Sequence, residues 1–329
     1  MKAIQYSEYG NPPDVAELVD LETGAAGPDE VVVEMEAVAI SLGNLYDIMG
    51  RAGFQRSLPA VAGNKCVGRI LEIGSAVSGF EIGERVYVTL YSAGTWREQV
   101  RVPANVVYPA PDTGDPGELS LVSGGVLTPY FALTDLVKLE PGDWVIQNSA
   151  NSNCGRNLIK LARMWGYKTA NVVRREAAFD GLEALGADAL IIDGPDLAAR
   201  VAEATGGADI KLGIDGIAGE ATERLADCLG EGASIACYGL ASQTDHCKIS
   251  VNALLFKDIR LVGHYIARAR TGRARDDLIR VYREASDLVV NGILKAEIAG
   301  VYPLAEIKDA LTHALKDGAD RKGKVILVP

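Results

Sequence analysis

The residues best suited to chemistry lie in a turn that follows a predicted strand over Trp144–Gln147. The turn reads Asn148-Ser149-Ala150-Asn151-Ser152-Asn153-Cys154-Gly155. A helix is expected to begin there, and the backbone N–H groups at a helix N-terminus stabilise a pyrophosphate. Of the glycines in a GxGxxG fingerprint only Gly155 is present, so the turn alone is a weak signal. Gly155 permits close helix–strand packing, and Asn153 is expected to make the turn because asparagine tolerates the left-handed conformation.

A second predicted strand, Lys168–Val173, follows about 20 residues later and leads into Arg174-Arg175. Sites that prefer NAD offer a carboxylate to the ribose 2′-hydroxyl at this strand end, whereas guanidinium groups suit the 2′-phosphate of NADP. The arginine pair therefore predicts NADPH as the cofactor. The alternative is a solvated strand end at which Glu176 pairs with either arginine.

The composition excludes several classes of protein. A chain of 329 residues has room for two domains, and its net charge of -11 argues against general nucleic-acid binding. The five cysteines are scattered without a CxxC pair, which predicts reduced thiols and a cytoplasmic location. No apolar run has the length of a membrane span, and Met1–Tyr6 is expected to begin a strand rather than a targeting segment.

Neither metal nor Ser/His/Asp chemistry is predicted. Zinc sites need Cys, His or carboxylate ligands at suitable spacing, and the only histidines are His246, His264 and His313. Cys66 is the only cysteine in the β-rich first part of the chain, and none of the histidines lies there. No Ser in a G-x-S-x-G turn has a base nearby. The expected metal site is therefore none.

The elements that must position these residues fall into two groups. The first ~100 residues are β-rich, of barrel or sandwich type, because segments such as Val31–Ile40 alternate apolar and polar side chains. From about residue 120 strands alternate with helices, which predicts a doubly wound parallel sheet. Two amphipathic helices and a strand at Lys324–Val328 then return to the first domain. The predicted domains are 1–118 with 268–329, and 119–267.

The chain resembles the zinc-independent branch of the medium-chain dehydrogenase/reductases, and within it the mitochondrial-type trans-2-enoyl-thioester reductases. Gly63-Asn64 and Ser41 stand where zinc-dependent relatives carry metal ligands. The resemblance implies an α/β protein with a GroES-like β-rich catalytic domain and a Rossmann nucleotide domain. The matching stretches cover most of the chain: Ser57–Asn64, Ala93–Arg97, Leu127–Tyr130, Ile146–Asn148, Asn171–Arg174 and Phe256–Leu261.

The implied activity is NADPH-dependent reduction of the C=C bond of an α,β-unsaturated carbonyl compound, expected to be a 2-enoyl thioester. Tyr46, Asn44 and Trp96 are the expected catalytic residues. Ala52 stands where the family carries its proposed proton donor, a tyrosine, so that Tyr46 or water is left for that role; Tyr46 is otherwise a packed tyrosine. The expected cofactor residues are Asn44, Thr128, Asn151, Ser152, Asn153, Cys154, Gly155, Arg174, Arg175, Tyr238 and Gly239.

Two other functions stay open: an NADPH quinone reductase, which needs no carbon acid, and a catalytically silent NADPH-binding redox sensor. Expected partners are a small-molecule or thioester substrate and a second copy of the chain, paired through the strand near Arg260–Ile266; no nucleic acid or membrane is expected. The arginine-rich run Arg268–Arg275 is predicted to be a loop. It is interpreted as a phosphate clamp for the thioester handle or as a solvated loop paired with Asp276 and Asp277.

Overall fold

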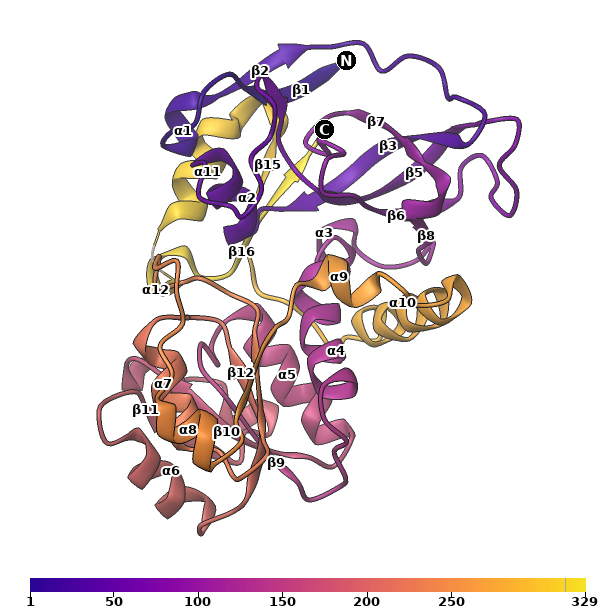
Figure 1. Ribbon diagram of the computed structural model, residues 1–329. Helices are drawn as coiled ribbons and strands as arrows, with labels where there is room; N and C mark the ends of the chain where they lie inside the picture. The colour runs from indigo at the N-terminus through magenta and orange to yellow at the C-terminus, as the bar shows by residue number, and fades with distance from the viewer. Residues whose placement is uncertain (317) are drawn as a thin grey trace. The chain divides into compact units, whose positions relative to one another are not determined.

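Two units, each with its own core, make up the chain in the computed structural model, which describes residues 1–316 and 318–329. Unit 1 combines Met1–Ser123 with Arg273–Pro329, and unit 2 is Gly124–Gly272 (Figure 1). Unit 2 is thus an insertion in unit 1. The divisions follow residues 123 and 272, where the sequence analysis placed them after residues 118 and 267.

Unit 1 is built on two sheets. The larger has the order β15-β16-β3-β5-β6-β8, with β7 also paired to β3, and the smaller has the order β2-β1-β4. The strands are β1 (Lys2–Tyr6), β2 (Ala16–Asp20), β3 (Glu30–Ala39), β4 (Ala60–Val61), β5 (Lys65–Ile73), β6 (Arg85–Thr89), β7 (Gln99–Pro103), β8 (Val107–Pro109), β15 (Ile298–Pro303) and β16 (Lys324–Val328).

The central strand β3 has the predicted alternation only over residues 33–37, since residues 31–33 and 37–40 are all buried. Val33, Met35 and Ala37 are buried, while Glu34 between them is exposed. β16 lies between β15 and β3, with Leu327 opposite Val38. The predicted return of the final strand to the first domain is therefore confirmed.

The helices of unit 1 are short, with one exception. They are α1 (Pro12–Val15), α2 (Leu42–Ile48), α3 (Pro116–Leu119), α10 (Arg275–Val290), α11 (Ile307–Leu315) and α12 (Gly318–Arg321), with 3-10 turns η1 (Ala104–Val106) and η5 (Leu304–Glu306). The long helix α10 buries an apolar stripe that includes Leu278, Tyr282 and Val289. Tyr282 stacks on Tyr87 and Tyr108, whose strands belong to the larger sheet.

Unit 2 is a six-stranded parallel sheet with the order β11-β10-β9-β12-β13-β14. This is the doubly wound order 3-2-1-4-5-6 of a Rossmann fold. The mixed α/β class and the Rossmann unit agree with the sequence prediction, and β9 and β10 have the bounds predicted for them. The strands are β9 (Trp144–Gln147), β10 (Lys168–Val173), β11 (Ala189–Ile192), β12 (Ile210–Asp215), β13 (Ser234–Cys237) and β14 (Arg260–Gly263).

The helices of unit 2 cover both faces of this sheet (Figure 1). Leu197 of α6, Leu225 of α7 and Ala253 of α8 share one apolar cluster, whereas Ile159 of α5 belongs to a second. The helices are α4 (Leu127–Asp135), α5 (Asn153–Met164), α6 (Leu197–Thr205), α7 (Glu220–Asp227), α8 (Val251–Phe256) and α9 (Ile266–Arg270), with turns η3 (Glu176–Phe179) and η4 (Glu183–Leu185); the π-helix η2 (Val122–Val126) precedes α4.

The arginine-rich run differs from its prediction. Residues 266–270 form α9, not a loop, and only residues 271–274 are irregular before α10 begins. Within unit 1, Arg273 forms an ion pair with Asp277 at 2.6 Å, as the solvated-loop interpretation expected. Arg275 donates to the carbonyl oxygen of Val107 and lies over the Tyr108 ring. Two of the four arginines therefore hold local structure.

Candidate cofactor and active-site residues

The turn between β9 and α5 is tighter than its sequence suggested. Ser149 occupies the left-handed region with φ of 51°. Asn153, expected to make the turn, is instead the first residue of α5, so that prediction is wrong. Ser152 caps the helix, because its Oγ accepts from the N–H of Gly155 at 3.1 Å.

Gly155 and Asn153 give this turn the character of an anion site. A Cβ on Gly155 would lie 2.5 Å from the carbonyl oxygen of Ala150, so the helix approaches the turn more closely than any side chain allows. The Nδ2 of Asn153 is buried without a hydrogen-bond partner in the structure. An orphaned buried donor at a helix N-terminus fits a phosphate oxygen, since anions are stabilised there. The residues present therefore fit a dinucleotide pyrophosphate.

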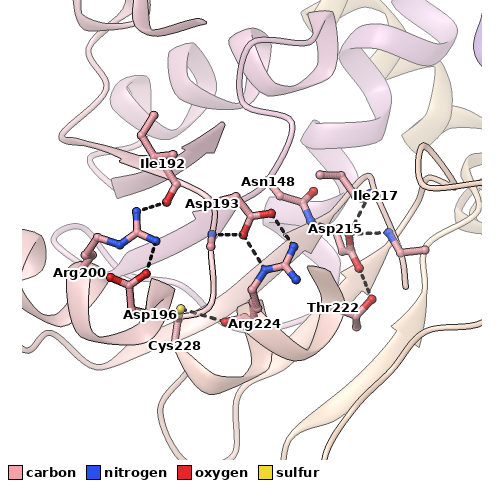
Figure 2. A network of polar contacts seen from close by, with 12 residues as sticks. Asn148, Ile192, Asp193, Asp196, Arg200, Asp215, Ile217, Thr222, Arg224 and Cys228 are labelled. Carbon is pink, nitrogen blue, oxygen red and sulfur yellow. Dashed lines mark hydrogen bonds and ion pairs between the residues drawn. The ribbon is translucent and has the colours of Figure 1, made fainter. Parts of the chain in front are cut away.

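Arg174 and Arg175 follow β10 directly and are both exposed. The neighbouring strand β11 leads into a carboxylate, Asp193, but Arg224 of α7 binds both of its oxygens, at 2.7 and 2.6 Å (Figure 2). Asp193 is thus committed to an ion pair. The end of β10 therefore presents two exposed guanidinium groups.

Three of the predicted cofactor residues line one small pocket within unit 2. Thr128, Cys154 and Tyr238 lie there with Gln147 and Leu158. Burial raises the pKa of the Tyr238 phenol, an effect that its hydrogen bond to Ser152 opposes. The residue after it, Gly239, meets the backbone of Gly216 so closely that a Cβ would lie 2.3 Å from that carbonyl oxygen.

A buried carboxylate at the end of β12 organises the neighbouring loops, and the sequence analysis missed it. Asp215 accepts hydrogen bonds from the Nδ2 of Asn148 at 2.6 Å and from the hydroxyl of Thr222 at 2.6 Å (Figure 2). The N–H groups of Ile217 and Ala218 also donate to it, at 2.8 and 3.0 Å. Its signal in the sequence was an acidic residue that ends an apolar strand, where an unpaired charge would be costly.

Asn44 combines a structural role with an unused donor. In α2 its Oδ1 accepts from the N–H and the Oγ of its N-cap Ser41, at 3.0 and 2.6 Å, which forms a capping box. Its Nδ2 is buried without a hydrogen-bond partner in the structure. The amide is thus held in one orientation and offers an N–H to a ligand.

Tyr46 and Trp96 are also buried in unit 1, at 6% and 0% exposure. Burial raises the pKa of the Tyr46 phenol, and the charge of Arg51 opposes this. The indole N–H of Trp96 is buried without a partner, and its ring belongs to the apolar core of unit 1. The N–H of Ala52 donates to the carbonyl oxygen of Tyr46 and closes the turn. Ala52 is the residue of this turn at which the family carries a tyrosine.

A buried ion pair anchors the segment that follows this turn. The Nε of Arg56 lies 2.6 Å from the Oδ2 of Asp47, and the hydroxyl of Tyr91 donates to the Oδ1 of Asp47 at 2.8 Å. Arg56 also donates to the carbonyl oxygens of Val61 and Gly63. No local pattern in the sequence indicates this network, because its members are up to 44 residues apart.

None of the helices within residues 1–316 and 318–329 has both the length and the apolar character of a membrane span.

Two family profiles match the chain. The alcohol dehydrogenase GroES-like domain matches residues 27–112, and the zinc-binding dehydrogenase domain matches residues 154–290. With the relatives described next, they show that the chain belongs to the medium-chain dehydrogenase/reductase superfamily, whose members are NAD(P)H oxidoreductases.

The curated relatives include mitochondrial enoyl-[acyl-carrier-protein] reductases. The one from Homo sapiens is 30% identical over 96% of this chain and 86% of its own length. The one from Caenorhabditis elegans is 33% identical over 95% and 92%. Among solved structures, a Bacillus thuringiensis protein provisionally assigned as an NADPH:quinone reductase superposes with a TM-score of 0.91 at 27% identity, over 100% of this chain and 98% of its own.

Proposed function

We propose that this protein is an NADPH-dependent reductase of the C=C bond of α,β-unsaturated carbonyl compounds, with a 2-enoyl thioester as its substrate. The observation that carries the proposal is the pair of guanidinium groups after β10, beside a helix N-terminus with an orphaned amide donor. The likeness to enoyl-[acyl-carrier-protein] reductases over nearly the whole chain supports the substrate class.

The proposed cofactor contacts divide by the part of NADPH that each would hold. Arg174 and Arg175 would bind the 2′-phosphate, and the N-terminal turn of α5 would bind the pyrophosphate. Thr128 and Tyr238 line a pocket with Cys154 and would lie toward the nicotinamide half. When bound, NADPH supplies the hydride that reaches the substrate β-carbon.

The chain's own residues would position the substrate and deliver a proton. The fixed Nδ2 of Asn44 would donate to a polar atom of the ligand, which would relieve its unsatisfied burial. The raised pKa of Tyr46 keeps its phenol protonated at neutral pH, as a proton donor to the α-carbon must be. Activity is proposed not to need a metal ion, because none of these steps uses one.

Quinone reduction is the second candidate, and Ala52 is the observation that favours it. A quinone needs no dedicated proton donor to carbon, so the loss of the family tyrosine would cost such an enzyme little. The likeness to the provisionally assigned quinone reductase supports the same alternative.

Oxidation of NADPH measured against a panel of 2-enoyl-CoAs, enals and quinones tests these functions together. Turnover on enoyl-CoAs well above that on quinones is expected. The reverse order would replace the proposal with the quinone reductase. Tight NADPH binding without turnover of any substrate would instead favour the third function, a catalytically silent NADPH-binding redox sensor.

The variant Ala52→Tyr sharpens the test by restoring the missing hydroxyl. A correctly placed general acid contributes about 10²-fold or more to a rate, so even an imperfect placement should raise enoyl-CoA turnover measurably. Ala52→Phe is the matched control, because it adds the ring without the hydroxyl. An equal response to both variants, or a rise in quinone reduction alone, would count against enoyl reduction.

A further inference from the structure

Three potential metal ligands converge beside the carboxyl ends of β12 and β13. Asp215, Cys237 and Cys247 offer one ligand atom each, and these atoms lie within 4.8 Å of one another. The two sulfurs are 3.6 Å apart. The sequence analysis missed the group because ligand spacing was sought within short motifs, whereas these residues come from two strand ends and a loop.

The distance between the sulfurs fits chelation of one ion. Two sulfurs bound to one zinc ion at about 2.3 Å and at the tetrahedral angle lie about 3.8 Å apart. Both cysteines are free and half-buried, so an ion can reach them from solvent. Thiolate sulfur selects thiophilic metals such as zinc over magnesium or calcium.

The backbone holds all three residues in place. Asp215 and Cys237 are direct partners in the parallel pairing of β12 with β13. Cys247 forms an isolated β-bridge with Gly219. The N–H of Gly219 donates to the carbonyl oxygen of His246 at 3.0 Å, and the backbone N–H of Lys248 donates to the carbonyl oxygen of Gly219 at 3.0 Å. Little ordering would accompany binding.

The charges around the thiols also favour a cation. Asp215 is fully buried, and its Oδ2, which accepts the Thr222 hydroxyl, has capacity for a second partner. The ammonium group of Lys248, which follows Cys247 in the chain, lies 2.9 Å from the carboxylate of Glu223, and this ion pair compensates its charge.

We propose that Cys237, Cys247 and Asp215 form a binding site for one thiophilic divalent cation of the zinc and cadmium class. Binding displaces the protons of two thiols, so that each ion bound as a dithiolate releases two protons. The site is separate from the reductase proposal and supplies no step of that reaction. An occupied site ties the loop at Cys247 to the end of β13, next to Tyr238 and Gly239.

The first test uses the unaltered protein. Titration with Cd²⁺ is expected to produce an ultraviolet cadmium–thiolate absorption that saturates at one equivalent, whereas Mg²⁺ produces none. Cd²⁺ should also protect two thiols from alkylation, and mass spectrometry should map them to Cys237 and Cys247. No saturable absorption, or protection of other cysteines instead, would overturn the proposal.

Variants then test the two thiol ligands. Cys237→Ser and Cys247→Ser should each weaken Cd²⁺ binding at least tenfold, measured by competition with a chromophoric chelator. Cys228→Ser is the matched control, because Cys228 is another half-buried thiol of unit 2 whose Sγ contacts the carbonyl oxygen of Arg224. Thermal unfolding checks that the variants fold. Unchanged affinity in folded Cys237→Ser and Cys247→Ser would contradict the assignment.

Discussion

We propose that single residues at the end of β10 decide which dinucleotide binds. A bond between Arg174 and a 2′-phosphate would be charge-assisted and worth about 1.5–3 kcal/mol. Arg174→Ala should therefore weaken NADPH binding by about tenfold or more while NADH binding changes little. Fluorescence titration with both cofactors measures the effect.

The control for this prediction is Arg163→Ala, since Arg163 is an exposed arginine near the other end of α5 and should matter to neither cofactor. If Arg174→Ala weakened NADPH and NADH equally, the arginine would be a structural residue and the cofactor preference would need another source.

Tyr46 is the second residue whose role can be isolated. If it protonates the α-carbon, Tyr46→Phe should lower kcat for an enoyl-CoA by ~10²-fold and spare NADPH binding and quinone reduction. Burial raises the pKa of the Tyr46 phenol above the ordinary 10.0, so any loss of kcat from its ionisation should begin at a higher pH than for an unperturbed phenol. Unchanged enoyl turnover in the variant would leave water as the donor.

The sequence predicted these residues unevenly, for physical reasons. Gly155 and Arg174 follow strands at fixed offsets, so their positions could be read from local spacing. Ser149 was missed because a serine rarely adopts positive φ, and only the tight turn imposes it. Asp215 and Asp47 were missed because their partners come from distant segments, and no local pattern records such contacts.

Among the elements, β14 and α8 present the surface that most needs covering. β14 is an edge strand of its sheet, and unpaired edges invite another chain. Val251, Leu255 and Phe256 of α8 are 65%, 71% and 75% exposed. Exposed apolar side chains of this size, in the helix that leads into an open edge strand, favour pairing with a second copy.

We therefore predict a homodimer that Phe256→Glu dissociates, because a carboxylate would be buried without a partner. Sedimentation velocity at micromolar concentration measures the change. Ile82→Glu is the control, since Ile82 is 72% exposed in unit 1 and lies outside this surface. A wild-type monomer under these conditions would refute the prediction.

The helix α9 carries the remaining charge of the arginine-rich run. If Arg268 and Arg270 bind the phosphates of a CoA handle, replacing both with Glu should raise KM for an enoyl-CoA, by a factor that shrinks as salt rises. A small uncharged enone is the control substrate and should not respond. Equal responses of the two substrates would exclude the clamp.

Secondary-structure prediction succeeded for elements that show a clear pattern of apolar residues in the sequence, and it failed for one that does not. The strands β9 and β10 of unit 2 are apolar runs bounded by turns, so their ends could be placed closely. α9 spans five residues, too few to show an apolar stripe, and the Gly272 that follows it suggested a loop. Arginine and alanine both have high helix propensity, which was the signal available.

For the whole molecule, we predict that reductase activity does not depend on a bound metal ion. Enzyme treated with a strong chelator should keep its NADPH-oxidising activity, because the cofactor supplies the hydride. Steady-state assays before and after treatment measure this. Activity that disappears and returns with Zn²⁺, in the wild type and in Cys247→Ser alike, would contradict it.

The position of β16 has a consequence for how the chain is made. The larger sheet of unit 1 needs β16 between β15 and β3, yet β16 is synthesised after every residue of unit 2. Domains emerging from the ribosome generally fold as units in the order in which they are completed. The nucleotide-binding unit is complete first, so it can fold while the first half of unit 1 still waits for its closing strand. The unit that begins first is therefore finished last, and the part of β3 that pairs with β16, at Val38 and Ala39, is what chaperones would have to protect in the meantime.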